Sequence, residues 1–233
     1  MEALTRVRPD DSRPGLYWAE LGGREQPATR NLAPGVSVYG EQLVVYEGVE
    51  YRLWDPYRSK LAGAILKGLK GYPLGPGRRV LYLGASTGTT VSHVSDIVGE
   101  GGVVFAVEVS HRVAREMLER VVRHRVNVIP IIEDARRPER YGFVYGKVDL
   151  EYCDIAQQDQ TEIAILNARR YLREGGDLLL VIKARSIDVT REPGDVIKGE
   201  VDKLVSAGFR VLQVVDLEPY DKDHAMVHAV RGA

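Results

Sequence analysis

A glycine-bearing segment between residues 79 and 98 has the residue types that bind a nucleoside cofactor. An apolar run at 79–83 is interrupted by Gly84, small and hydroxyl residues continue to Thr90, and apolar residues then recur at helical spacing. This order predicts a strand, a tight loop and a helix. Gly84 lets the backbone turn without a Cβ, Gly88 allows close approach of a ligand or a packed helix, and the first N–H groups of the helix lack backbone partners. The segment could therefore hold a nucleoside group.

The residues around this loop narrow the choice among dinucleotides, ATP and S-adenosylmethionine. A Walker loop would end in Gly-Lys-Ser/Thr, which this loop lacks, and a dinucleotide loop would have glycine where this chain has Ser86. The next apolar run, 103–107, ends in Glu108, whose carboxylate could accept hydrogen bonds from a ribose diol. Together, the loop and Glu108 favour an adenosine ligand without a phosphate chain. An ordinary strand-to-helix turn is the alternative interpretation.

Charged side chains come at the carboxyl ends of four predicted strands, at Glu108, Asp134, Asp154 and Lys183. Because the carboxyl ends of parallel strands meet at one edge of a sheet, we expect these side chains to lie near a common ligand. Lys60 stands in the first turn of a predicted helix, where the helix dipole disfavours a cation. Such a lysine either points into water or serves a site.

Strands alternate with helices downstream of residue 55, which predicts an α/β fold with a parallel sheet. We expect strands at 79–83, 103–107, 126–132, 148–153, 178–183, 211–217 and 224–230. The first helix should have Asp55 as its N-cap and Pro56 as its first residue, and the helix at 161–173 should end on Gly175-Gly176. The last two strands have no helix between them, which implies an antiparallel hairpin at the end of the sheet.

Residues 1–55 differ in composition and pattern from the rest of the chain. Frequent proline and glycine separate short pieces, and 43–46 and 51–54 indicate two strands joined by a turn. We therefore predict a small β-rich N-terminal domain at 1–55, followed by the main domain at 56–233.

The composition is that of an ordinary globular protein, with 233 residues, 44% hydrophobic residues and a net charge of −1. A protein that bound nucleic acid without partners would usually have more basic than acidic residues. Two basic clusters are either solvated surfaces or a modest RNA-facing patch that needs a partner: Arg120, Arg123, His124 and Arg125 in the first, and Arg136, Arg137 and Arg140 in the second.

The single cysteine, Cys153, rules out an intrachain disulfide and a cysteine-based metal cluster. It stands in an apolar run, so we expect a buried side chain, and we predict no metal site. No apolar run approaches the length of a membrane span, and the first residues lack the apolar core of a signal peptide. We therefore expect a cytoplasmic protein with no membrane partner.

Four motifs resemble fibrillarin, and in particular the archaeal fibrillarin-like RNA 2′-O-methyltransferases: residues 84–96, Asp-Pro-Tyr-Arg-Ser-Lys at 55–60, Asp-Ile-Ala-Gln at 154–157 and Asp-Lys-Asp-His-Ala at 221–225. The resemblance covers essentially the whole chain. It implies a class I methyltransferase fold (a Rossmann-like sheet) that binds S-adenosylmethionine and methylates ribose 2′-hydroxyls in rRNA and tRNA. One departure is Val109, where the family commonly has an aromatic residue that could stack on adenine.

The resemblance also implies the site residues. The cofactor contacts would be Gly84, Ala85, Thr89, Thr90, Glu108, Val109, Asp134, Ala135, Asp154, Ile155, Ala156 and Gln157. Glu108 would hold the ribose, Asp134 and the Ala135 backbone the adenine edge, and the region of Asp154 the methionine end. The catalytic tetrad of the family would fall on Lys60, Asp154, Lys183 and His224.

Methyl transfer from a sulfonium is an in-line displacement, so the protein has to align the 2′-oxygen and ease its deprotonation. We hypothesise that the charge of Lys183 lowers the pKa of the hydroxyl, that Asp154 accepts or orients the proton, and that His224 and Lys60 complete the network. The alternative is an ion-pair network in which the two lysines neutralise Asp154 and no proton moves.

Partners follow from the same resemblance: a box C/D guide RNA with its rRNA or tRNA target, a Nop-domain scaffold protein and a kink-turn-binding ribosomal-type protein. A nearly neutral chain agrees with a particle in which guide RNA and scaffold select the target.

Three other functions stay open. A methyltransferase for small molecules or proteins would have a substrate lid and usually a metal or catalytic motif, and a non-catalytic assembly subunit would have lost loop or tetrad residues. A dinucleotide oxidoreductase is the least supported.

Overall fold

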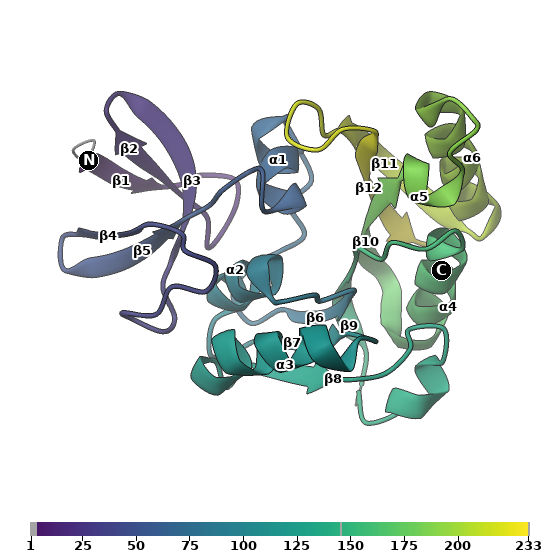
Figure 1. Cartoon of the computed structure of the whole chain (residues 1–233), viewed down its shortest axis with the longest axis horizontal. Helices are drawn as coiled ribbons and strands as arrows, with labels where there is room; N and C mark the ends of the chain where they lie inside the picture. Colours follow the sequence, from purple (N-terminus) through teal and green to yellow (C-terminus); the bar gives the residue numbers. More distant parts are fainter. Residues whose placement is uncertain (1–3, 145, 233) are drawn as a thin grey trace.

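In the computed structural model, which describes residues 4–144 and 146–232, the chain forms two β-sheets, a small one near the N-terminus and a larger one flanked by helices (Figure 1). The small sheet is antiparallel throughout, in the order β1-β2-β3-β5-β4. Its strands are β1 (Leu4–Pro9), β2 (Tyr17–Leu21), β3 (Arg24–Arg30), β4 (Leu43–Tyr46) and β5 (Val49–Leu53). The predicted strand-turn-strand unit is confirmed as the β4–β5 hairpin. The domain boundary after residue 55 stays a prediction.

The large sheet has the order β11-β12-β10-β9-β6-β7-β8. Its strands are β6 (Arg79–Leu83), β7 (Val103–Val107), β8 (Val128–Ile131), β9 (Val148–Cys153), β10 (Leu172–Lys183), β11 (Phe209–Asp216) and β12 (His224–Arg231). The strands from β10 to β8 run parallel, and β12 is antiparallel to both β10 and β11, so the predicted terminal hairpin is confirmed. The strand order reverses between β6 and β9, which is where open α/β sheets form a ligand crevice.

Helices cover both faces of this sheet. They are α1 (Lys60–Leu66), α2 (Thr89–Val98), α3 (His111–Arg120), α4 (Gln160–Tyr171), α5 (Ala184–Ile187) and α6 (Pro193–Ser206), with 3₁₀ turns η1 (Val122–His124) and η2 (Pro138–Tyr141). One buried apolar cluster joins the sheet to α1, α2 and α3, and a second joins the other face to α4 and α6. This three-layer arrangement confirms the predicted α/β fold. No helix among the described residues is long and apolar enough to cross a membrane.

Two predicted helix ends are wrong. Helix α1 begins at Lys60, because the Ser59 hydroxyl caps it by accepting a hydrogen bond from the Ala62 N–H, whereas Asp55 instead closes a local turn by accepting from the Tyr57 N–H. Helix α4 ends at Tyr171, and the chain continues directly into β10. Gly175-Gly176 therefore lies within β10, at a register break between Leu172 and Asp177.

A buried cluster of charged residues joins the small sheet to the large one. The Arg52 guanidinium of β5 lies 2.6 Å from the Asp96 carboxylate of α2 and 2.6 Å from Glu41. Arg125 lies 3.3 Å from the other oxygen of Asp96. Its side chain is buried, so its assignment to a basic surface cluster was wrong. The indole of Trp54 also packs into the main core, which fixes the small sheet against the large one.

Candidate active site

The loop after β6 brings two strand ends together because residue 84 is glycine. Gly84 has φ +81°, and a Cβ there would lie 2.8 Å from the main-chain oxygen of Asp154. Any other residue would therefore push the loop after β6 away from the loop after β9. Gly88 has a different role, because a Cβ there would lie 2.4 Å from a methyl carbon of Val121. It permits close packing beneath the N-terminus of α2.

Two adjoining cavities lie at this edge of the sheet. The first, of about 290 Å³, is bordered by the ends of β7, β8 and β9, and the second, of about 330 Å³, lies between the glycine loop and α1. They share Gly84, Ser86, Asp154 and Lys183. Every cofactor contact that the resemblance implies lines one cavity or the other: Gly84, Glu108, Val109, Asp134, Ala135 and 154–157 the first, and Ala85, Thr89 and Thr90 the second.

The first cavity has the chemistry that adenosine needs. The Glu108 carboxylate is held in place by the main-chain N–H groups of Ser86 and Ser110, each at 2.8 Å, and retains lone pairs for the hydroxyls of a ribose. Val109, Ala135 and Ile163 supply apolar lining for a flat base. The residues therefore fit S-adenosylmethionine. Val109, whose side chain is exposed, offers an aliphatic face there in place of a ring.

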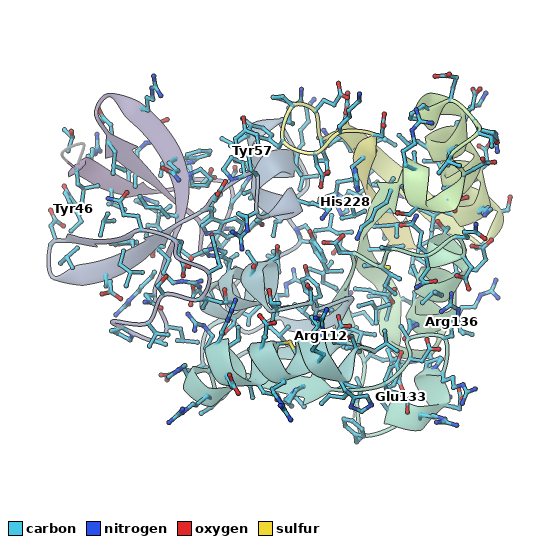
Figure 2. All side chains as sticks on the ribbon, viewed as in Figure 1. Tyr46, Tyr57, Arg112, Glu133, Arg136 and His228 are labelled. Carbon is cyan, nitrogen blue, oxygen red and sulfur yellow. The ribbon has the colours of Figure 1, made fainter. Side chains whose placement is uncertain are left out.

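Arg136 lines the first cavity, although the sequence placed it only in a basic cluster. Its guanidinium lies 2.6 Å from the Asp159 carboxylate and donates to the Gln157 side chain at 3.0 Å. Asp159 raises the pKa of Arg136, and the hydrogen bond from Arg136 lowers the pKa of Asp159. Figure 2 shows Arg136 and Glu133 on the chain that follows β8. The arginine of a predicted basic cluster thus joins the loop after β8 to the segment that precedes α4.

The second cavity contains three of the four predicted catalytic side chains. The Lys183 ammonium lies 2.8 Å from one carboxylate oxygen of Asp154 and donates to the main-chain oxygen of the same residue at 2.8 Å. The Lys60 ammonium lies 3.4 Å from the other carboxylate oxygen. All three side chains are largely buried, with exposures between 13 and 23%. One carboxylate therefore lies between two cations at the end of the cofactor cavity.

His224 lies next to Lys183 in the sheet but forms no hydrogen bond or ion pair with Asp154 in the described structure. It begins β12 and pairs with Lys183 in the antiparallel register of β10 and β12. Its Nδ1 lies 3.1 Å from the carboxylate of Asp221 and 2.6 Å from the main-chain oxygen of Lys222. Asp221 in turn lies 3.5 Å from the Lys60 ammonium. The sequence analysis missed Asp221, although it stands in the motif at 221–225.

The wall beneath the cluster is neutral. Tyr82 lines the second cavity and stacks on Tyr152, with ring centroids 4.5 Å apart. Burial raises the pKa of Tyr82 well above its usual value, so its hydroxyl stays protonated. Cys153 is buried, as predicted, and burial raises the pKa of its thiol. The charged side chains that line the second cavity are therefore those of Arg58, Lys60, Asp154 and Lys183.

Comparisons with known proteins agree with these features. The Fibrillarin family model matches residues 7–232. A fibrillarin-like rRNA/tRNA 2′-O-methyltransferase of Saccharolobus solfataricus is 57% identical over 213 residues, which are 91% of each chain. The crystal structure of Aeropyrum pernix fibrillarin with natively bound S-adenosyl-L-methionine is 49% identical, with a TM-score of 0.92 over 99% of this chain and 100% of that one. The fibrillarin of a fibrillarin/Nop5p complex is 45% identical, with a TM-score of 0.79 over 88% of this chain and 94% of that one. The resemblance seen in the sequence motifs is confirmed, and the chain belongs to the fibrillarin family.

Proposed function

We propose that this protein transfers a methyl group from S-adenosylmethionine to ribose 2′-hydroxyls of rRNA and tRNA. The observation that carries the proposal is the position of Asp154, held between Lys60 and Lys183 at the junction of the two cavities. The names of the relatives and the cofactor bound by the Aeropyrum pernix fibrillarin support it.

The geometry supports separate roles for the residues that would bind the cofactor and for those that would act on the 2′-oxygen. Bound S-adenosylmethionine would supply an activated methyl group on its sulfonium. Glu108 would hold the cofactor ribose, and Thr89, Thr90 and the segment after Asp154 would hold its methionine end. The Lys183 ammonium would stabilise the negative charge that develops on the 2′-oxygen, because a fixed cation in a partly desolvated site acts strongly on a nearby charge. The 2′-oxygen would form its bond to the methyl carbon as the carbon–sulfur bond breaks and leaves a neutral thioether on the cofactor, and Asp154 would take the hydroxyl proton.

Arg58 supports the approach of RNA from the side of the second cavity. It is exposed, lines that cavity, and lies over the Tyr39 ring at 5.5 Å. Within residues 4–144 and 146–232 it has no carboxylate partner, whereas Lys60, Lys183 and Arg136 are all paired. A guanidinium at the wall of this cavity that has no carboxylate partner suits a phosphate of the target strand.

The proposed setting is a box C/D particle. The complex of a related fibrillarin with Nop5p supports a Nop-domain scaffold as partner. The guide RNA and the kink-turn-binding protein are predictions from the resemblance, and a cytoplasmic location is a prediction from the sequence pattern. A net charge of −1 supports the view that these partners supply much of the RNA affinity.

The test is transfer of labelled methyl from S-adenosylmethionine to a guide-complementary RNA. Reactions would contain this protein alone or with scaffold, kink-turn binder and guide RNA, and each would include a target with a 2′-deoxy nucleotide at the guided position. We expect label in the full assembly and none on the deoxy target. Label on the deoxy target would mean base methylation, and no label despite confirmed assembly would support a non-catalytic subunit; either result would overturn the proposal.

A further inference from the structure

We propose that Asp221 is a positioning residue of this active site, which holds Lys60 against Asp154 and orients the His224 ring. The proposal rests on the function proposed above. It starts from a chain of contacts that runs from Asp154 through Lys60 and Asp221 to His224. Without Asp221, His224 has no side-chain link to the other three residues in the described part of the chain.

The loop that carries Asp221 is fixed on α1. Figure 1 shows the yellow loop between β11 and β12 beside this helix, and Figure 2 shows Tyr57 at the same place. The Tyr220 ring meets the Tyr57 ring edge-on, with centroids 5.3 Å apart. Gly63 of α1 lets the Tyr220 side chain lie close against the helix, because a Cβ at residue 63 would be only 3.3 Å from the Tyr220 Cβ. The main-chain N–H of Asp221 also donates to the Leu217 oxygen at 3.1 Å. The carboxylate therefore has a defined position.

The position of Lys60 at the start of α1 makes its positive charge unfavourable unless nearby carboxylates balance it. It is the first residue of α1, and the positive end of the helix dipole opposes its charge. Asp154 and Asp221 lie at 3.4 and 3.5 Å from its ammonium, so neither dominates. Asp221 offsets the unfavourable dipole and keeps the ammonium at the edge of Asp154. The second oxygen of Asp154 then stays directed toward Lys183.

His224 is oriented by the same carboxylate. Both partners of its Nδ1, the Lys222 main-chain oxygen and the Asp221 carboxylate, can only accept a hydrogen bond. Nδ1 therefore carries the proton, and in the neutral ring Nε2 is the acceptor. The Lys222 oxygen, which accepts the Nδ1 proton at 2.6 Å, and the Asp221 carboxylate, which lies 3.1 Å from the same nitrogen, together favour this tautomer and leave the opposite nitrogen available for proton transfer. Nε2 has no partner among the described residues, so it is available for a proton of the reacting groups.

The loop also contains a matched control. Asp223 lies two residues away, and its carboxylate accepts from the Arg185 guanidinium at 3.2 Å. The Asp223 carboxylate forms no ion pair or hydrogen bond with the side chain of Lys60 or His224 in the described structure. Because φ of Asp223 is +58°, a conformation that asparagine tolerates well, Asp223→Asn keeps the local backbone.

The experiment compares Asp221→Asn, Asp221→Ala, Asp221→Glu and Asp223→Asn in the full assembly under single-turnover conditions. We expect Asp221→Asn and Asp221→Ala to lower the rate about 10- to 100-fold, the usual effect of misplacing reacting groups, with KM for RNA and Kd for S-adenosylmethionine unchanged. Asp221→Glu should restore part of the rate, and Asp223→Asn should match the unmodified protein. A rate unchanged by both Asp221→Asn and Asp221→Ala, or cofactor and RNA affinities lost in step with the rate, would overturn the proposal.

A second measurement does not depend on activity. ¹⁵N NMR of the histidine rings should show His224 as the Nδ1–H tautomer in the folded protein. Asp221→Ala should shift the His224 ring ¹⁵N resonances, because Nδ1 then keeps only the Lys222 main-chain oxygen as acceptor, whereas Asp223→Asn should leave them unchanged. If the unmodified protein transferred no methyl, the proposed function would fail, while these resonances would still show whether Asp221 acts on His224. An Nε2–H tautomer in the unmodified protein, or His224 resonances that Asp221→Ala leaves unchanged, would overturn that assignment.

Discussion

At the scale of single residues, the site depends on how one carboxylate is shared. Asp154 faces Lys183 at 2.8 Å and Lys60 at 3.4 Å, and its own main-chain oxygen accepts a hydrogen bond from Lys183. Lys183 is therefore oriented by two atoms of the same residue. An ion pair of this kind could neutralise charge and do nothing more, or it could deliver a cation to the 2′-oxygen. The two interpretations differ in what removal of the lysine does to the rate.

We expect Lys183→Ala to lower the single-turnover rate of methyl transfer by about 10²- to 10⁴-fold, the usual range for a lost acid–base or electrostatic contribution. RNA and cofactor should still bind. Lys198→Ala is the matched control, because Lys198 is exposed on α6. Rapid-quench measurement in the assembled particle checks both variants. An unchanged rate for Lys183→Ala would assign the cluster to charge neutralisation alone.

At the scale of elements, the strand–loop–helix unit can form the cofactor cavity because two loops approach each other closely. The loop after β6 and the loop after β9 meet at Gly84 and Asp154, and the Ser86 N–H then reaches Glu108. Ser86 itself has φ +51°, in the region that non-glycine residues seldom adopt. The loop therefore accepts an uncommon backbone conformation and directs its N–H group toward the carboxylate of the neighbouring strand.

Gly84→Ala tests this close approach, with Gly77→Ala as control. Both glycines have positive φ, +81° and +77°, but a Cβ at Gly77 would meet nothing within 4 Å. The backbone cost of a left-handed alanine, about 1 to 2 kcal/mol, should appear in both. Gly84→Ala should lose a further ~1 to 3 kcal/mol of unfolding free energy from the clash, and should also lose cofactor affinity. Denaturant unfolding and calorimetric titration would measure these losses. Equal losses in both variants, with cofactor binding retained, would contradict the packing argument.

At the scale of the whole molecule, the small sheet is attached through buried polar groups. His93 of α2 is fully buried, and its ring nitrogens lie 3.1 Å from the Thr29 hydroxyl and 2.8 Å from the Tyr39 hydroxyl. Burial lowers the pKa of His93 well below its usual 6.5, and the positive charges of Arg52 and Arg125 lower it further. The ring is therefore neutral in the folded protein.

This neutral histidine predicts how stability changes with pH. Below pH 6.5 the unfolded chain binds a proton at residue 93 that the folded protein does not, so the unfolding free energy should fall as pH decreases. The slope contributed by His93 is about 1.4 kcal/mol per pH unit at most. His93→Gln should reduce this slope between pH 6.5 and 5, while His111→Gln, on the exposed start of α3, should retain it. Denaturant unfolding at a series of pH values checks this, and an equal slope in both variants would contradict it.

Local sequence properties determined much of this protein. The backbone freedom of Gly84, the period of the apolar residues and the charged residues at strand ends are readable without contacts, and they predicted the parallel strands, the cofactor loop and Glu108. The resemblance to fibrillarin supplied the two lysines beside Asp154. Tertiary structure alone decided that Ser59 rather than Asp55 caps α1, that Arg125 is buried against Asp96, and that His224 lies beside Asp221 instead of Asp154. Each of these depends on which distant groups compete for a hydrogen bond or an ion pair, and that competition is settled only when the chain has packed.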